Sequence, residues 1–223
     1  MNDSHRPAPS TLHEEASRYA LLRRLVPTLR HHMAGEFQPI GMMAALLERR
    51  LQQASPDLAS LRENSSAIGN LSRNAAETCV SLMGWVAPRA PASVRADTAV
   101  TECVNLLSTS LRFRGFAVSH EVTDLDAPLA CNAVRSVLTA TLLALSDSAT
   151  QPADLVVRAR REGAGQVLVE VQMSPADRSA DNGGSEDYRP LTWDDVACLA
   201  AAESVQVERS EGRVQLRLAV QAQ

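Results

Sequence analysis

The sequence contains no lysine, and all 22 of its basic residues are arginines. This absence excludes the chemistry that needs a lysine from the same chain: a P-loop phosphate lysine, a Schiff-base lysine or the ATP-binding lysine of protein kinases. Aromatic residues are also few, with two Trp, two Tyr and three Phe, and there is no dense basic run. Together with a formal net charge of -4, these features argue against nucleic acid as the main partner.

Cysteine is sparse, and long apolar runs are missing. The four cysteines lie far apart without a CxxC pair, and no signal peptide is recognisable. We therefore expect free thiols, buried or half-buried, in a reducing cytoplasm. No apolar run approaches the ~18 residues of a membrane span, so we expect no membrane partner. With 223 residues and 45% hydrophobic content, the chain can form one large or two small domains with buried cores.

Residues 21–51 form the longest periodic stretch, with apolar side chains at heptad spacing. This spacing predicts an amphipathic helix that packs along another helix. On that register His31 lies farthest from the apolar seam and should point into water, whereas His32 lies on its flank. An exposed imidazole on a rigid helix is a candidate nucleophile, although a surface histidine is more often an ordinary polar residue. The two rows of the seam are Val26, Met33, Ile40 and Leu47, and Leu22, Leu29 and Met43.

Residues 57–86 show a second heptad pattern, preceded by Ser55 and Pro56, which favour a helix start. Two such helices joined by a short loop predict an antiparallel hairpin. A hairpin is too thin to shield its own apolar seam, so we expect two copies to associate into a four-helix bundle as a homodimer. The rows of this helix are Leu61, Ile68, Ala75 and Leu82, and Leu71, Thr78 and Trp85.

The expected fold class is α+β, with the helical hairpin followed by a second domain. A polar, Pro-containing start predicts disorder, and a Pro- and Ala-rich stretch without helical period predicts a linker. The expected parts are a disordered tail at residues 1–15, the hairpin at 16–87, the linker at 88–96 and an α/β domain at 97–223.

Beyond the linker, the apolar patterns predict alternating helices and strands. Thr192, with Asp195 three residues later, forms a close relative of the capping box and marks the start of the last helix. The expected elements are helices at 97–113, 132–148 and 192–202, and strands at 116–122, 155–161, 166–173, 205–209 and 213–220.

The segment HHMAGEFQPI, residues 31–40, resembles the phosphoacceptor box of sensor histidine kinases, in which apolar residues follow the histidine at fixed spacings. Anchoring this pattern on His31 places apolar residues at all three positions, whereas anchoring it on His32 does not. His31 is therefore the better match for the phosphoacceptor, with His32 as the second choice. The positions matched from His31 are Met33, Phe37 and Ile40, and those matched from His32 are Ala34, Gln38 and Gly41.

Two positions of this box are altered. His32 stands where the family carries the acidic residue that acts as base in autophosphorylation, and Glu36 stands where it carries a kinking proline. Pro39, three residues later, can supply a kink against Gly35 instead. These changes weaken the case for an ATP-driven reaction at His31.

The order of the later elements resembles the ATP-binding domain of histidine kinases, a layer of helices on a mixed sheet. The two Asn residues that hold magnesium and phosphates in that family correspond here to Ala140 and Ala144, whose methyl groups cannot coordinate a hard cation. The family's adenine-reading acid and its glycines are replaced by Met-Ser-Pro at residues 173–175, and a later DNGG at 181–184 is more simply a flexible loop. The second glycine box is also absent. We therefore expect a degenerate ATPase-like α/β sandwich without a cofactor or metal.

The whole pattern resembles dimeric histidine phosphotransferases of the ChpT-like and sporulation types, whose subunits look like histidine kinases that have lost ATP. The resemblance implies phosphoryl transfer between His31 and the Asp of a response-regulator receiver domain, alone or in a hybrid histidine kinase, in a bacterial two-component phosphorelay. The receiver supplies magnesium and the groups that stabilise the phosphoryl. Arg30, His32 and Arg24 lie near enough in sequence to orient the phosphate, although a solvated basic face explains the arginines as well.

Glu36, Met42 and Ala45 are further candidates for the receiver-binding surface, with the helical core as the competing interpretation for Met42 and Ala45. An alternative function is that of an inert pseudokinase, a dimeric binding or inhibitory module for a kinase or response regulator. The altered residues His32 and Glu36 favour this alternative. An active ATP-dependent kinase is disfavoured by Ala140, Ala144 and residues 173–175.

Overall fold

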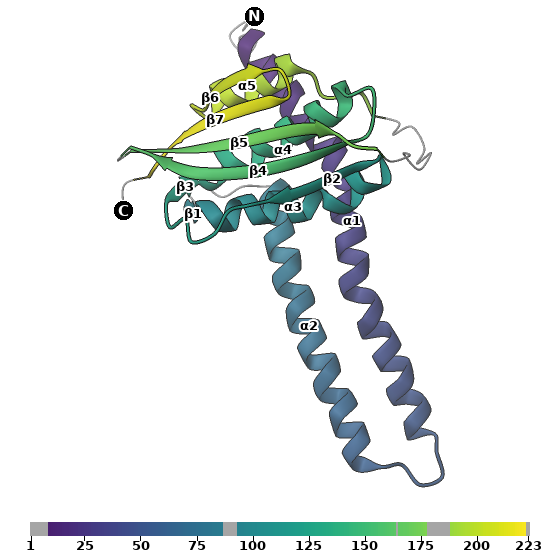
Figure 1. Cartoon of the computed structure of the whole chain (residues 1–223). Coiled ribbons are helices and arrows are strands. Elements are labelled where there is room, and N and C mark those ends of the chain that lie inside the picture. Colours follow the sequence, from purple (N-terminus) through teal and green to yellow (C-terminus); the bar gives the residue numbers. More distant parts are fainter. Residues whose placement is uncertain (1–8, 87–92, 164, 178–187, 222–223) are drawn as a thin grey trace, which may run out of the picture. The chain divides into compact units, whose positions relative to one another are not determined.

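The computed structural model describes residues 9–86, 93–163, 165–177 and 188–221 (Figure 1). The chain divides into two compact units, of which the first comprises Met1–Leu25 and Ala90–Gln223 and the second comprises Val26–Arg89. The fold combines helices and strands, with a helical hairpin and an α/β unit, as the sequence predicts. Within the described part of the chain, no helix is both long and apolar enough to pass through a membrane.

The hairpin unit consists of the greater part of helix α1 (Pro9–Leu51) and helix α2 (Leu58–Val86), joined by a short loop (Figure 1). Arg50 fastens the end of α1 to the start of α2, because its Nη1 donates hydrogen bonds to Ser60 Oγ at 2.8 Å and Asn64 Oδ1 at 3.3 Å. The predicted rows of α2 are buried or half-buried along the whole helix, in keeping with a face turned toward α1.

Helix α1 begins earlier than expected. Residues 9–15, assigned above to a disordered tail, are helical, while residues 1–8 lie outside the described part of the chain. Proline suits the first helical position because its fixed φ matches a helix and its missing N–H needs no partner there. An ion pair between Arg18 and Glu14, one turn apart, supports these first turns at 2.9 Å.

The first part of α1, up to Leu25, belongs to the α/β unit and not to the hairpin. The hairpin unit therefore begins at Val26, and not at residue 16 as expected. Ala20, Leu21 and Leu25 are buried there, with Leu25 only 1% exposed. The sequence gives no sign of this division, because the apolar period of the helix continues through it.

The α/β unit contains a five-stranded mixed sheet in the order β2-β4-β5-β7-β6. Strand β2 runs parallel to β4, and the other neighbours are antiparallel. Two short strands, β1 and β3, form a separate antiparallel pair that the sequence did not predict, and β1 occupies part of the expected linker. Residues 88–92 of that linker lie outside the described part. The strands are β1 Ser93–Arg95, β2 Phe116–His120, β3 Pro128–Ala130, β4 Ala153–Glu162, β5 Gln166–Pro175, β6 Gln206–Ser210 and β7 Arg213–Ala219.

Three helices, α3 (Ala96–Phe113), α4 (Cys131–Ser148) and α5 (Trp193–Ala202), lie on one face of this sheet (Figure 1). Alternating apolar residues of the strands point to them and are buried, as period-2 patterning requires. Helix α4 lies deepest, with every residue from Val137 to Ser146 buried. The predicted capping box at the start of α5 is present, since Thr192 and Asp195 exchange hydrogen bonds.

Candidate functional site

His31 lies on α1 within the hairpin unit, and its side chain is exposed, whereas His32 is half-buried. Their ring centroids are 6.5 Å apart and the rings are nearly perpendicular, at 87°. The backbone around them is continuous helix. A histidine held in this way is accessible to a macromolecular partner.

Helical geometry explains why the two histidines differ. A helix turns by about 100° per residue, so the half-buried residues of α1 cluster on one side, the side facing α2. His31 lies about 130° round the helix from the centre of that side, while His32 lies on it. The residues that define the side facing α2 are Leu29, His32, Glu36, Met43, Leu47 and Arg50.

The residues predicted to act with His31 lie on different sides of α1. Met42, which is 66% exposed, and the exposed Ala45 lie within about 40° of His31 round the helix, below it toward the loop. Their exposure excludes the core interpretation for the single chain. Arg30 is exposed but lies about 100° away, and Glu36 turns toward α2. The structure thus groups His31 with Met42 and Ala45, and it separates Glu36 from them.

Arg24 does not take part in this group. Its guanidinium donates two hydrogen bonds to the carboxylate of Asp147, at 2.8 and 2.9 Å, and its side chain is 3% exposed. The suggestion that Arg24 helps to neutralise a phosphate is wrong, because its side chain is buried and paired with Asp147. The sequence does not reveal this pair, since the two residues are 123 positions apart.

A second side of the hairpin is apolar and exposed. On α1 it includes Val26, Met33, Phe37 and Leu51, which lie about 145° round the helix from His31. Two of these, Val26 and Met33, were expected in the seam with α2 but are 48% and 37% exposed. We call this surface the apolar flank; its large residues are Val26, Met33, Phe37 and Leu51 of α1 and Leu58, Val80 and Met83 of α2.

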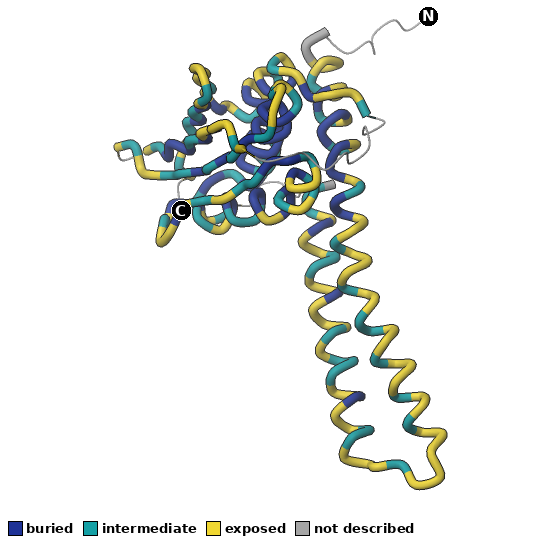
Figure 2. Tube along the Cα trace, turned by 45° about the vertical axis from the view of Figure 1, so that its right-hand side comes forward, coloured by how far each residue is buried: buried dark blue, intermediate teal, exposed yellow. Residues whose placement is uncertain are grey.

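The α2 residues continue the same surface. Because α2 is antiparallel to α1, helical periodicity places Leu58, Val80 and Met83 on the same side of the hairpin as the α1 residues. They are 78%, 72% and 58% exposed. The hairpin itself buries little, since Ala75 and Leu82 are the only buried apolar residues between positions 30 and 85, where most of the tube is exposed or intermediate (Figure 2).

The positions expected to have lost nucleotide ligands lie in the α/β unit. Ala140 and Ala144 of α4 are 0% and 1% exposed, so they are packed in the core. The backbone N–H of Met173, near the end of β5, donates to Gly212 O at 2.8 Å, which ties this strand end to the β6–β7 turn. The DNGG segment at 181–184 lies outside the described residues. Among the residues that are described, no group of three or more His, Cys, Asp and Glu could hold a metal ion.

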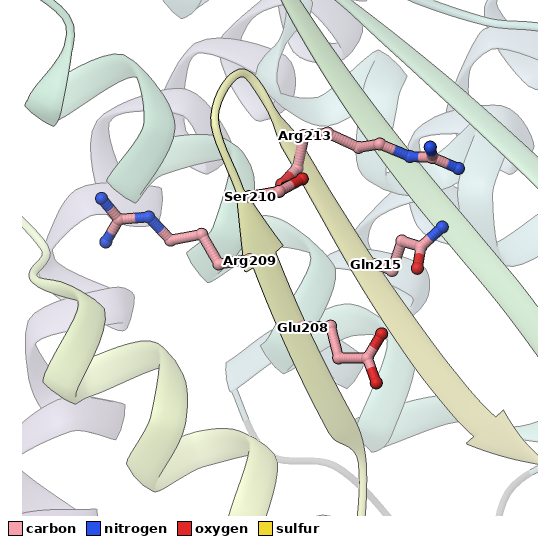
Figure 3. Close-up of a pocket in the computed structure, with 5 residues that line it drawn as sticks. All are labelled: Glu208, Arg209, Ser210, Arg213 and Gln215. Carbon is pink, nitrogen blue, oxygen red and sulfur yellow. The ribbon is translucent and has the colours of Figure 1, made fainter.

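A shallow hollow of about 330 Å³ lies on the β6–β7 hairpin (Figure 3). Its cationic residues already have partners: Arg213 pairs with Glu170, and Arg209 lies over the Trp193 ring at 4.5 Å. Glu208, which lines the same hollow, pairs with Arg217 at 2.9 Å. The hollow therefore offers little uncompensated charge for a ligand. Its lining residues are Glu208, Arg209, Ser210, Arg213 and Gln215.

Comparison with known proteins gives distant likenesses only. No family model and no curated protein matches the chain. Among solved structures, the Acinetobacter baumannii histidine kinase AdeS is similar over 80% of this chain and 94% of that chain, at 12% identity and a TM-score of 0.42. The catalytic domain of histidine kinase ThkA is similar over 58% of this chain and 93% of that chain, at 10% identity, with TM-scores of 0.42 and 0.40 in two nucleotide-free crystal forms.

Proposed function

We propose that the chain is a dimeric histidine phosphotransfer protein of two-component signalling, in which His31 exchanges a phosphoryl group with the aspartate of a response-regulator receiver domain. The observation that carries this proposal is the position of His31. Its side chain is exposed, and it lies on the side of α1 opposite to the apolar flank.

The apolar flank is the reason for proposing a homodimer. A hairpin that buries only two apolar residues between positions 30 and 85 lacks a core of its own. Pairing the flanks of two copies would give a four-helix bundle with a shared core, as bundle architecture requires. Because His31 lies about 145° round α1 from the flank, the same pairing would leave both imidazoles on the outside.

The proposed transfer requires only a positioned nucleophile from this chain. An imidazole nitrogen of His31 attacks the phosphorus of an aspartyl phosphate, a P–N bond forms, and the P–O bond to the aspartate breaks to release its carboxylate. The charge that develops on the phosphoryl oxygens is stabilised by magnesium and cationic groups of the receiver. The chain must hold the imidazole in line and accessible, which a continuous helix with an exposed His31 does.

We assign the receiver-docking surface to the side of α1 that carries His31, Met42 and Ala45. Met42 offers a flexible apolar contact at 66% exposure, and the small side chain of Ala45 allows close approach. Arg30 lies about 100° round α1 from His31, outside this surface, so it is not assigned to phosphate binding. His32 and Glu36 face α2 and act, in this proposal, on the orientation of the helix and not on the phosphate.

The alternative is an inert pseudokinase that uses the same surfaces for binding alone. It is favoured by the replacement of the box's acidic residue by His32 and of its proline by Glu36, while the burial of Ala140 and Ala144 fits both functions. The two functions differ only in whether His31 accepts phosphate.

Phosphotransfer from radiolabelled receiver domains of the source organism separates them. Label should appear on the wild-type protein and on His32→Ala, and should be absent from His31→Ala, which still binds the receiver. Met42→Ala should slow transfer while leaving the acceptor in place. Receiver binding without label on any variant would establish the pseudokinase instead. Incubation with radiolabelled ATP that yields an acid-labile phosphoprotein would contradict both functions.

A further inference from the structure

Asp147, at the end of α4, is a buried junction that the proposed function does not use. Its side chain is 4% exposed, and its carboxylate accepts two hydrogen bonds from Arg24 of α1, at 2.8 and 2.9 Å. It also accepts one from Arg114, just after α3, at 2.7 Å and one from the backbone N–H of Leu191 at 2.8 Å. One carboxylate therefore joins α1, the end of α3, α4 and the segment that leads into α5.

Two further polar contacts fasten the same part of α1 to α5. Ser17 Oγ donates to Asp195 Oδ1 at 2.8 Å in a buried position, and Arg18 pairs with Glu203 at 2.8 Å. Asp195 also accepts from Arg189 and from Thr192, and these hydrogen bonds, with that of Arg189 the strongest, hold the pKa of its carboxyl well below its ordinary value. The polar residues in the first part of α1 therefore bind to carboxylates, and one of these, Asp195, is held in place by further hydrogen bonds.

The apolar share of this attachment is small. Between Ser17 and Leu25 the buried apolar residues are Ala20, Leu21 and Leu25. Directly beyond them the boundary between the two compact units passes through α1, between Leu25 and Val26. Pro27 follows, and because it has no N–H, the carbonyl of Arg23 lacks the hydrogen bond that would stiffen the helix here.

We propose that residues 17–25 of α1 form a strap that closes the α4–α5 side of the α/β unit and can open by itself, with the Arg24–Asp147 pair as its fastening. Segments held by a few polar contacts open locally at lower free energy than sheet cores. The strap has this character, whereas the central strands of the sheet carry fully buried apolar residues such as Leu155 of β4, Val169 of β5 and Val214 of β7. Bending at Pro27 lets the strap leave without unwinding the rest of α1.

Opening would expose the apolar side chains of the strap itself, Ala20, Leu21 and Leu25, which are now buried, together with the surface that they cover. A buried ion pair is a strong attachment, because neutralising one partner removes attraction that offsets the cost of burying the other charge. The strap would therefore be closed in the resting protein and would be released by loss of either charge.

Hydrogen exchange of the full chain tests the strap. In the wild type, amides of residues 17–25 should exchange far more slowly than those of the exposed middle of α2. Asp147→Asn and Arg24→Gln should each raise their exchange rates by about 100-fold or more, as expected for a broken buried pair, while amides of β4 and β5 keep their wild-type rates. Binding of the dye ANS should rise in both variants.

Arg18→Gln is the matched control. It removes a pair whose arginine side chain is 35% exposed, so the exchange of residues 17–25 should rise by less than about fivefold. Where Asp147→Asn fails to fold, Arg24→Gln decides, because it leaves Asp147 with Arg114 and Leu191. The proposal is overturned if β4 and β5 lose protection together with residues 17–25, if Arg24→Gln itself does not fold, or if Arg18→Gln and Arg24→Gln act equally.

Discussion

Replacing Phe37 by Ala should weaken self-association and leave the His31 surface untouched. Phe37 lies on the apolar flank, about 120° round α1 from His31, and half of its surface, 49%, is exposed in the single chain. In the proposed homodimer this exposed half is buried against the second copy.

The structure sets the size of the effect. Full burial of a Phe side chain contributes about 1.5–3 kcal/mol, so burying the exposed half contributes about 0.7–1.5 kcal/mol per copy. Each dimer contains two copies, and the loss on substitution is therefore about 1.5–3 kcal/mol. Because 1.4 kcal/mol corresponds to a tenfold change, the Kd of the dimer should rise by about 10- to 150-fold.

Sedimentation velocity over a range of protein concentrations measures this Kd. Met42→Ala is the matched control, since Met42 is also a large exposed apolar residue of α1 but lies on the His31 side. Its Kd should equal that of the wild type. A wild-type chain that remains monomeric at micromolar concentration, or equal shifts for the two variants, would refute the assignment of the apolar flank.

Two further predictions concern the α/β unit. The pKa of Asp195 is lowered from its ordinary value of 3.8, chiefly by the hydrogen bond from Arg189. The charged carboxylate therefore stabilises the folded state fully above about pH 4, and this stability is lost as the pH falls below that value. Asp195→Asn should therefore lower the urea midpoint at pH 7 and flatten its decline between pH 4 and pH 2; an unchanged acid profile would contradict this. Ala144→Asn should cost about 1–3 kcal/mol of unfolding free energy, because it buries an amide without partners at a position that is 1% exposed, and it should not create binding of a fluorescent ATP analogue.

Local patterns were sufficient to predict most elements of the α/β unit. The Thr192–Asp195 spacing correctly located the start of α5, since a capping box is a short-range signal. The two strands expected at 155–161 and 166–173 are present as β4 and β5, and Gly163 between them has a φ of +67°, which favours glycine. Likewise the apolar pattern at 132–148 correctly predicted a helix, and α4 is buried from Val137 to Ser146, as expected of a helix that is apolar on most sides.

The features that were missed depend on partners distant in sequence. Strand β1 pairs with β3 more than thirty positions later, and three residues carry too little period to be recognised. Residues 9–15 were expected to be disordered because their composition is polar, yet they are helical. They lead into a part of α1 whose Ser17, Arg18 and Arg24 find partners in α4, in α5 and just after α5. For the candidate site, periodicity gave the exposure of His31, while the role of Arg24 depended on Asp147.

The burial of Ala140 and Ala144 gives a physical reason why the fold can persist without nucleotide chemistry. In a helix buried from Val137 to Ser146, an Asn at either position would leave its amide without partners whenever an ion was not bound, whereas a methyl group packs at no such cost. Alanine at both positions therefore suits a helix that is buried on all sides. If His31 acts as proposed, its phosphoryl group and the magnesium come from the receiver, and the contribution of this chain is to present an exposed imidazole on a helix.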